Sequence, residues 1–155
     1  MLLLVKENGV GGLAGPVRTV AAKAADVAVK FEVVEVSMDN LREAKCEVCR
    51  VGAPPAKQEE IDEFLAASQG WEVVELQGEP QLRKVYRFGS FREALAFTNR
   101  VGEAAEAEGH HPAILTEWGM VTVRWWTHKI GNIHRNDLIM AAKSDALYEQ
   151  AGRAG

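Results

Sequence analysis

The side chains of this chain that best suit acid/base chemistry lie between residues 106 and 137, where Glu106, His110, His111, His128 and Asp137 occur. Imidazole exchanges protons readily near neutral pH, because its ordinary pKa is about 6.5. Histidines beside carboxylates therefore suit a reaction that delivers one proton and removes another. We take this group as the candidate active site.

The carboxylate of Glu106 precedes His110 by four residues, at the end of a predicted helix. That spacing puts both side chains on one side of the helix, so Glu106 can accept the imidazole N–H and fix the tautomer of the ring. His110 and His111 are adjacent, and adjacent residues in an extended segment point to opposite sides, which disfavours a shared metal ion. The structural alternative is a histidine whose cation interacts with the helix dipole.

The other candidates lie where predicted elements begin or end. His128 is expected at a strand end, at the rim of the sheet, facing the adjacent histidines. Asp137 is expected to cap the last helix, with a supporting role in the site as the alternative. Trp118 and Trp126 each offer a flat apolar surface on which a ring can stack, and packing in the core is an equally good interpretation for each. His134 is predicted to be a loop residue.

The spacing of these residues resembles the signature of a known family. It reads Glu106-x3-His110-His111-Pro112-x5-Trp118-x9-His128-x8-Asp137 and resembles that of the pterin-4a-carbinolamine dehydratases. The resemblance covers roughly residues 55–150. It implies a hydro-lyase that dehydrates 4a-hydroxytetrahydropterin to quinonoid dihydropterin, which recycles the pterin cofactor of aromatic amino acid hydroxylases. It also implies that no metal or organic cofactor is needed.

The same resemblance suggests roles for individual residues. His110 and His128 are expected to form the acid/base pair, with the assignment of acid and base left open, and His111 is expected to bind the pterin. Glu106, Trp118 and Asp137 are expected to support the site or contact the substrate.

Two other classes of function remain open at this stage. Some members of this family are similar to transcriptional cofactors that bind the dimerisation helices of a regulator, a role that depends on helix surfaces. A zinc-binding module using Cys46, Cys49 and two histidines is the second. The simplest interpretation of Cys46 and Cys49 is a pair of reduced thiols in a loop before the domain.

Hydrophobic periodicity predicts an α+β fold with a four-stranded antiparallel sheet covered on one face by about three helices. Ser90 and Glu93 have the capping-box form, so a helix is expected to begin at Phe91 and to end at Gly109. The order is helix 58–68, strands 71–76 and 81–88, the helix from Phe91, strands 113–118 and 121–128, and helix 136–150.

Two helical faces are predicted to be apolar. The stripe on the middle helix comprises Phe91, Ala94, Leu95, Thr98, Val101 and Ala105. The inner stripe of the last helix comprises Leu138, Ile139, Ala142, Ala146 and Leu147.

An antiparallel sheet of four strands leaves two edges whose N–H and C=O groups need a partner or a cover. The family resemblance implies pairing of sheets across a two-fold axis, so we expect a homodimer or homotetramer. The last helix carries Ile139, Met140 and Leu147, and this apolar surface is expected to add a contact between copies.

Length and charge bound the remaining possibilities. The chain has 155 residues and a net charge of −4, with acidic and basic residues interspersed, which provides no basic surface for nucleic acid or anionic lipid. The apolar run Leu2–Val5 is too short to cross a membrane. We expect a cytoplasmic protein that binds neither nucleic acid nor membranes directly.

The first third of the chain differs from the rest. Residues 1–52 are predicted to be an extension that is disordered or foreign to the native protein, and residues 53–150 to be the dehydratase-like domain. Met38 opens a more polar segment, so one interpretation starts the native protein there. A transit peptide is an alternative for the residues before it.

Overall fold

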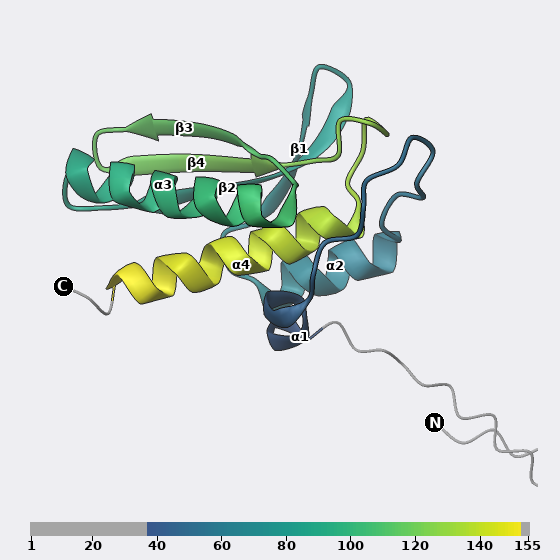
Figure 1. Cartoon of the computed structure of the whole chain (residues 1–155), viewed down its shortest axis with the longest axis horizontal. Helices are drawn as coiled ribbons and strands as arrows, with labels where there is room; N and C mark the ends of the chain where they lie inside the picture. The colour runs from purple at the N-terminus through teal and green to yellow at the C-terminus, as the bar shows by residue number, and fades with distance from the viewer. Residues whose placement is uncertain (1–36, 153–155) are drawn as a thin grey trace, which may run out of the picture. The chain divides into compact units, whose positions relative to one another are not determined.

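The computed structural model describes residues 37–152, which form one sheet and four helices (Figure 1). The strands are β1 (Glu72–Leu76), β2 (Glu79–Arg87), β3 (Ala113–Glu117) and β4 (Met120–Trp125), in the antiparallel order β1-β2-β4-β3. The helices are α1 (Met38–Glu43), α2 (Gln58–Ala67), α3 (Phe91–Glu108) and α4 (Arg135–Gly152). The predicted α+β fold is therefore confirmed. Among the helices described, none is long and apolar enough to cross a membrane.

The ends of α3 follow from the residues that stand there. Ser90 Oγ accepts a hydrogen bond from the Glu93 backbone N–H at 3.2 Å, and the Glu93 carboxylate accepts one from the Gly89 N–H at 2.8 Å. Gly109 ends the helix in the left-handed conformation, with φ of 63°. A residue without Cβ adopts this conformation at little cost. Both boundaries agree with the prediction.

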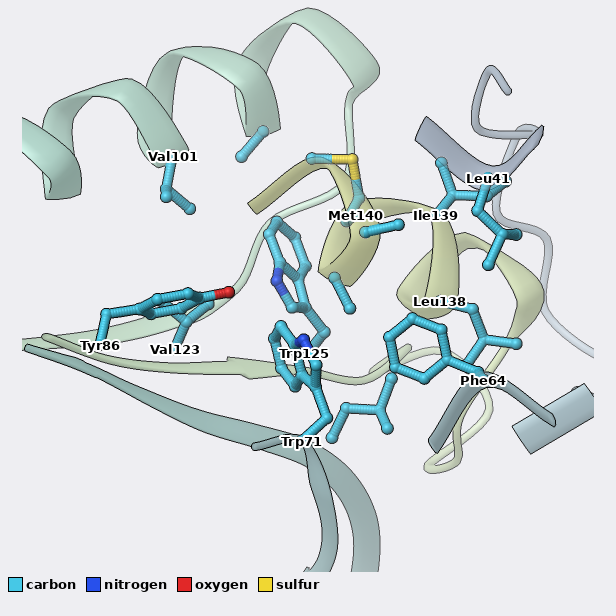
Figure 2. Packing of buried hydrophobic residues seen from close by; sticks show 14 of the residues in the cluster. Leu41, Phe64, Trp71, Tyr86, Val101, Val123, Trp125, Leu138, Ile139 and Met140 are labelled. Atoms are coloured by element: carbon cyan, nitrogen blue, oxygen red, sulfur yellow. The ribbon is translucent and has the colours of Figure 1, made fainter. Parts of the chain in front are cut away.

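The core lies between one face of the sheet and the helices α3 and α4 (Figure 2). Alternate residues of β2 and β4 point inward, because side chains of a strand alternate between the two faces. The sheet contributes the fully buried side chains Leu82, Tyr86, Val121, Val123 and Trp125. The helices contribute Phe64, Phe97, Val101, Leu138 and Met140.

The predicted stripe of α3 is corrected at two positions. Phe97 is 1% exposed, whereas Phe91 and Leu95 are 47% and 44% exposed. A helix turns by about 100° per residue, so the spacing of the buried residues defines a stripe that passes beside Leu95 rather than through it. Phe91 and Leu95 therefore lie at the margin of the core, next to solvent.

The apolar surface of α4 is buried within the chain itself. Ile139 is 2% and Met140 1% exposed, and α1 packs against α4 through Leu41, which is 1% exposed. A helix that is apolar on more than one face needs a cover on each. Because α1 supplies the second cover, Ile139 and Met140 do not form the expected contact between copies. This is a correction to the sequence prediction.

A buried carboxylate joins α4 to the sheet. Asp145 accepts hydrogen bonds from Trp71 Nε1 at 3.0 Å, Lys84 Nζ at 2.8 Å and the Tyr86 hydroxyl at 2.7 Å. Burial, followed by the negative charge of Asp145, raises the pKa of the Tyr86 hydroxyl well above its ordinary value. Tyr86 therefore remains a neutral donor to Asp145. Each partner of this buried charge stabilises the packing of α4 on β2 and on Trp71, the residue before β1.

The segment predicted as an extension packs partly on the domain. Residues 38–52 include α1 and the loop that carries both cysteines, whereas residues 1–36 lie outside the described part of the chain. Leu41 belongs to the main core cluster, and the Cys46 N–H donates to Glu108 Oε2 at 2.9 Å. We therefore propose that the folded domain begins at Met38 rather than at residue 53.

Two truncations test this boundary. A chain that starts at Met38 is expected to keep the stability of the full chain, because it retains every residue of the core cluster found within residues 37–152. A chain that starts at Ala53 is expected to lose about 2–5 kcal/mol of unfolding free energy, since it loses the buried Leu41. Urea unfolding of both chains measures the difference. Equal stability of the Ala53 chain would contradict the proposed boundary.

Candidate active site

The three histidines predicted for catalysis line one cavity of about 160 Å³ at the end of the sheet. Two loops form most of its wall, one after α3 and one after β4, and Cys49 completes it from the loop between α1 and α2. The lining residues are Cys49, Gly109, His110, His111, Trp126, Thr127, His128 and Lys129. Segments distant in the sequence thus contribute to a single site.

His110 and His111, which follow the end of α3, lie in different environments. The Gly109 N–H donates to Glu106 O at 3.2 Å and the His110 N–H to Ala105 O at 3.1 Å, which closes the last turn of the helix. His110 then points inward, is 5% exposed, and stacks on Trp125 with ring centroids 5.7 Å apart and an interplanar angle of 11°. His111 points outward and is exposed. The two rings thus lie in opposite directions, as expected for adjacent residues in an extended segment.

His110 is held by a fully buried carboxylate. His110 Nε2 lies 2.6 Å from Asp137 Oδ1, and Asp137 is 0% exposed. The other carboxylate oxygen accepts from Thr127 Oγ1 at 2.9 Å and from the His134 backbone N–H at 2.7 Å. Asp137 therefore both caps α4 and orients His110. Since an ionised carboxylate only accepts, Nε2 carries a proton and Nδ1 is the exchangeable nitrogen.

Glu106 pairs with His111 rather than with His110. His111 Nε2 lies 3.0 Å from Glu106 Oε1, and both side chains are largely in solvent. The left-handed residue Gly109 reverses the chain at the helix end, so the residue five positions after Glu106 returns over it. An exposed pair of this kind contributes little to stability, and its effect is to orient the His111 ring.

The second wall of the cavity places an aromatic ring beside His128. The rings of Trp126 and His128 are 4.2 Å apart, and His128 is exposed. Trp126 is fixed in turn, because its Nε1–H donates to Glu79 Oε2 at 2.9 Å and the Arg124 guanidinium lies 5.7 Å from its ring. Trp126 is thus the flat surface that the structure brings to the site.

Trp118 does not join the other candidates within one chain. It lies in the turn between β3 and β4 and is 74% exposed, whereas His111 lies just before β3 begins. A strand of five residues spans about 16 Å, so β3 separates Trp118 from the cavity. Neither the stacking role nor the core role predicted for Trp118 is seen in the single chain.

Sequence reasoning assigned no role in this site to Lys129 or His134, and it considered Cys49 only as a zinc ligand. Cys49 Sγ lies 3.5 Å from His110 Nδ1, and Lys129 Nζ donates to the Cys49 carbonyl at 2.8 Å. His134 lies in the loop just before α4, as predicted, but it is buried, and its Nδ1 accepts the Asn136 N–H at 3.1 Å in the first turn of the helix. For Cys49, the only signal in the sequence was its spacing from Cys46.

The loop that carries the cysteines is fixed by Glu108. Its carboxylate accepts hydrogen bonds from Lys143 Nζ and from the Cys46 N–H. Hydrogen bonds from Lys143, and then from Cys46, lower the pKa of Glu108 below its ordinary value. Within residues 37–152 no group of three or more His, Cys, Asp or Glu side chains is arranged to hold a metal ion. The zinc alternative therefore rests on the sequence alone.

Comparison with known proteins connects this site to a family. The sequence matches the family described as Pterin 4 alpha carbinolamine dehydratase over residues 54–147. A Syntrophotalea carbinolica protein named after this family is 60% identical over 112 residues, which are 72% of this chain and 100% of that protein. A similarly named Gloeobacter violaceus protein is 55% identical over 113 residues, which are 73% of this chain and 97% of its own.

A solved structure also resembles the fold. It is a crystal structure described as a transcriptional coactivator/pterin dehydratase from Brucella melitensis, with a TM-score of 0.55 and 26% sequence identity. The match covers 61% of this chain and 98% of that one.

Proposed function

Because this chain belongs to the pterin 4 alpha carbinolamine dehydratase family, we propose that it dehydrates 4a-hydroxytetrahydropterin to quinonoid dihydropterin by histidine acid/base catalysis. One observation carries the proposal: His110, His111 and His128 line a single cavity, although 18 positions separate the first from the last. A reaction that moves two protons needs two exchanging groups within reach of one small molecule.

The proposed reaction requires a proton for the departing 4a-hydroxyl group and the removal of a proton from ring N5. His110 Nδ1 can serve one of these transfers, since Asp137 occupies Nε2 and stabilises the imidazolium form. The exposed ring of His128 can serve the other from the loop after β4, which lines the same cavity. Lone-pair donation within the pterin then expels the protonated 4a-hydroxyl group as water.

The substrate would be held by the remaining wall of the cavity. The Trp126 indole provides a flat apolar face for a bicyclic ring, and His111, oriented by Glu106, provides a polar contact. The cavity of about 160 Å³ is smaller than ordinary small-molecule sites, which span about 300–1,000 Å³. It therefore accommodates the reacting edge of the pterin and leaves the rest of the molecule outside.

Direct measurement of dehydration tests this proposal. Carbinolamine generated in place by a hydroxylase should lose water faster in the presence of the protein than at its spontaneous rate. The acceleration should scale with protein concentration and vanish on heat denaturation. A rate indistinguishable from the spontaneous one, with folded protein in excess, would rule out the function.

The alternative of a transcription cofactor is not favoured by any contact among residues 37–152. The coactivator description belongs to the Brucella protein, which is 26% identical.

The protein is also expected to form a homodimer or homotetramer. β1 and β3 are the edges of the sheet; β3 carries the exposed apolar side chain of Leu115, and α3, which contacts β3, carries that of Leu95. Pairing through β3 would satisfy its free backbone groups and cover these side chains. Light scattering at micromolar concentration should give a mass of at least two chains.

A charge introduced on each edge strand in turn shows which of the two strands forms the contact between copies. Leu115→Lys on β3 is expected to dissociate the oligomer, and Val73→Lys on β1, where the side chain is 42% exposed, serves as the matched control. A wild-type mass near 17.0 kDa would show that the chain is monomeric.

A further inference from the structure

The thiol of Cys49 lies against Nδ1 of His110, the ring nitrogen that does not contact Asp137. Cys49 Sγ is 3.5 Å from His110 Nδ1, and the Nε2 atom of the same ring is 2.6 Å from Asp137 Oδ1. A thiol, an imidazole and a carboxylate are thus in line. This order of groups activates cysteine nucleophiles, because the imidazole takes the thiol proton while the carboxylate stabilises the resulting cation.

The hydrogen-bond directions at this cluster are set by Asp137. Its carboxylate accepts the Nε2–H of His110, so Nδ1 of the neutral ring is an acceptor and the Cys49 S–H is its donor. Asn136 Nδ2 lies 3.4 Å from the same sulfur and donates to it. A donor aimed at sulfur favours the negative charge that develops when the thiol loses its proton.

The position of Asn136 is itself fixed by the cysteine loop. Its amide group accepts the Glu47 N–H at 3.0 Å and donates to the Glu47 carbonyl at 2.7 Å. Lys129 Nζ donates to the Cys49 carbonyl at 2.8 Å and holds the backbone of that residue. Hydrogen bonds from both sides therefore hold Cys49 against His110.

The two cysteines of the chain have different surroundings. Burial, followed by the charge of Glu108, raises the pKa of the Cys46 thiol to about 12, so it stays protonated at neutral pH. Cys49 is partly exposed and lines the cavity of the three histidines. A small molecule entering that cavity therefore meets the Cys49 sulfur, whereas Cys46 reacts poorly because the thiolate is the nucleophile.

We propose that Cys49 is a reactive thiol that exchanges with low-molecular-weight disulfides, with His110 as its base and Asp137 as the positioning residue. The thiol proton passes to His110 Nδ1 as Cys49 Sγ attacks one sulfur of the disulfide R–S–S–R. A Cys49–S–S–R bond forms, the S–S bond of the reagent breaks, and the leaving thiolate takes the proton from His110. The reaction consumes one disulfide and releases one thiol, R–SH.

The modified side chain would occupy the cavity wall beside His111 and His128. It would also remove the thiol from His110 Nδ1. Modification should therefore abolish pterin dehydration, and a reducing thiol should restore it. This last consequence rests on the proposed function, whereas the reactivity of Cys49 does not.

The test compares single thiols in the full-length chain with dithionitrobenzoate, an aromatic disulfide that releases a coloured thiolate. Cys46→Ser leaves only Cys49. The matched control is Val48→Cys in the Cys46→Ser/Cys49→Ser background, because position 48 lies in the same loop and is 81% exposed. At pH 7, Cys49 is expected to react about tenfold faster than the control despite its lower exposure. A rate at or below that of the control would overturn the proposal.

Two further variants in the Cys46→Ser background test the base. His110→Gln and Asp137→Asn should each reduce the rate to that of the control, with circular dichroism confirming that the chain is folded. Unchanged rates in folded variants would overturn the role of His110.

Dehydration measured before and after modification separates the two proposals. Full dehydratase activity of the chain modified at Cys49 would overturn the inference that the modification blocks the cavity. Absence of dehydration in every form would refute the proposed function, while the thiol rates would still decide whether Cys49 is activated.

Discussion

Replacing His128 by alanine is expected to lower the rate of pterin dehydration by about 10²–10⁴ and to leave the fold intact, because general acid or base catalysis contributes about that much. His128 is exposed, and its ring contacts Trp126 at the cavity wall rather than the core. Its removal therefore costs little stability. Turnover per folded chain should fall, and the urea midpoint should stay where it is in the wild type.

The companion variant His110→Gln should cause a similar loss of rate, since the amide cannot exchange the proton at the position of Nδ1. His111→Ala is expected to raise KM more than it lowers kcat, because His111 is assigned to substrate binding. Glu117→Ala, an exposed change at the far end of β3, is the control that should alter neither. Turnover like that of the wild type in both His128→Ala and His110→Gln would refute the catalytic assignment.

Local signals in the sequence were enough to predict most of the fold. Ser90 with Glu93, and Gly109, identify both ends of α3, because caps act through hydrogen bonds between near neighbours. The alternation along β4 identifies Val121, Val123 and Trp125 as core residues, all 0% exposed. By contrast α1 was missed, since a helix of six residues owes its stability to packing on α4, which no local pattern reveals.

The candidate site was predictable where neighbours in sequence share it and unpredictable where the fold brings partners together. The adjacent histidines and His128 do line one cavity. The partner of His110 on its second nitrogen could not be inferred, because Cys49 lies 61 positions away. The choice between Trp118 and Trp126 also depends on which end of β4 faces the cavity, and this is known only once β3 and β4 are paired.

Replacing Asp137 by alanine is expected to lower both the dehydration rate and the stability. The change leaves His110 Nε2, the Thr127 hydroxyl and the His134 N–H buried without their acceptor. Removing one partner of a buried hydrogen-bonded pair of this kind costs about 3–5 kcal/mol, so we expect a loss of that size in unfolding free energy. The rate should fall by about 10² or more, because the His110 imidazolium loses the carboxylate that stabilises and orients it.

Asp145→Ala is the matched control, because Asp145 is also a buried carboxylate with three donors but lies between α4 and the sheet, outside the cavity lining. Both variants should unfold at lower urea concentrations. Measured at a temperature where both remain folded, only Asp137→Ala should show reduced kcat. An equal loss of kcat in the two variants would mean that Asp137 acts through stability alone, and an unchanged kcat in Asp137→Ala would remove it from the site.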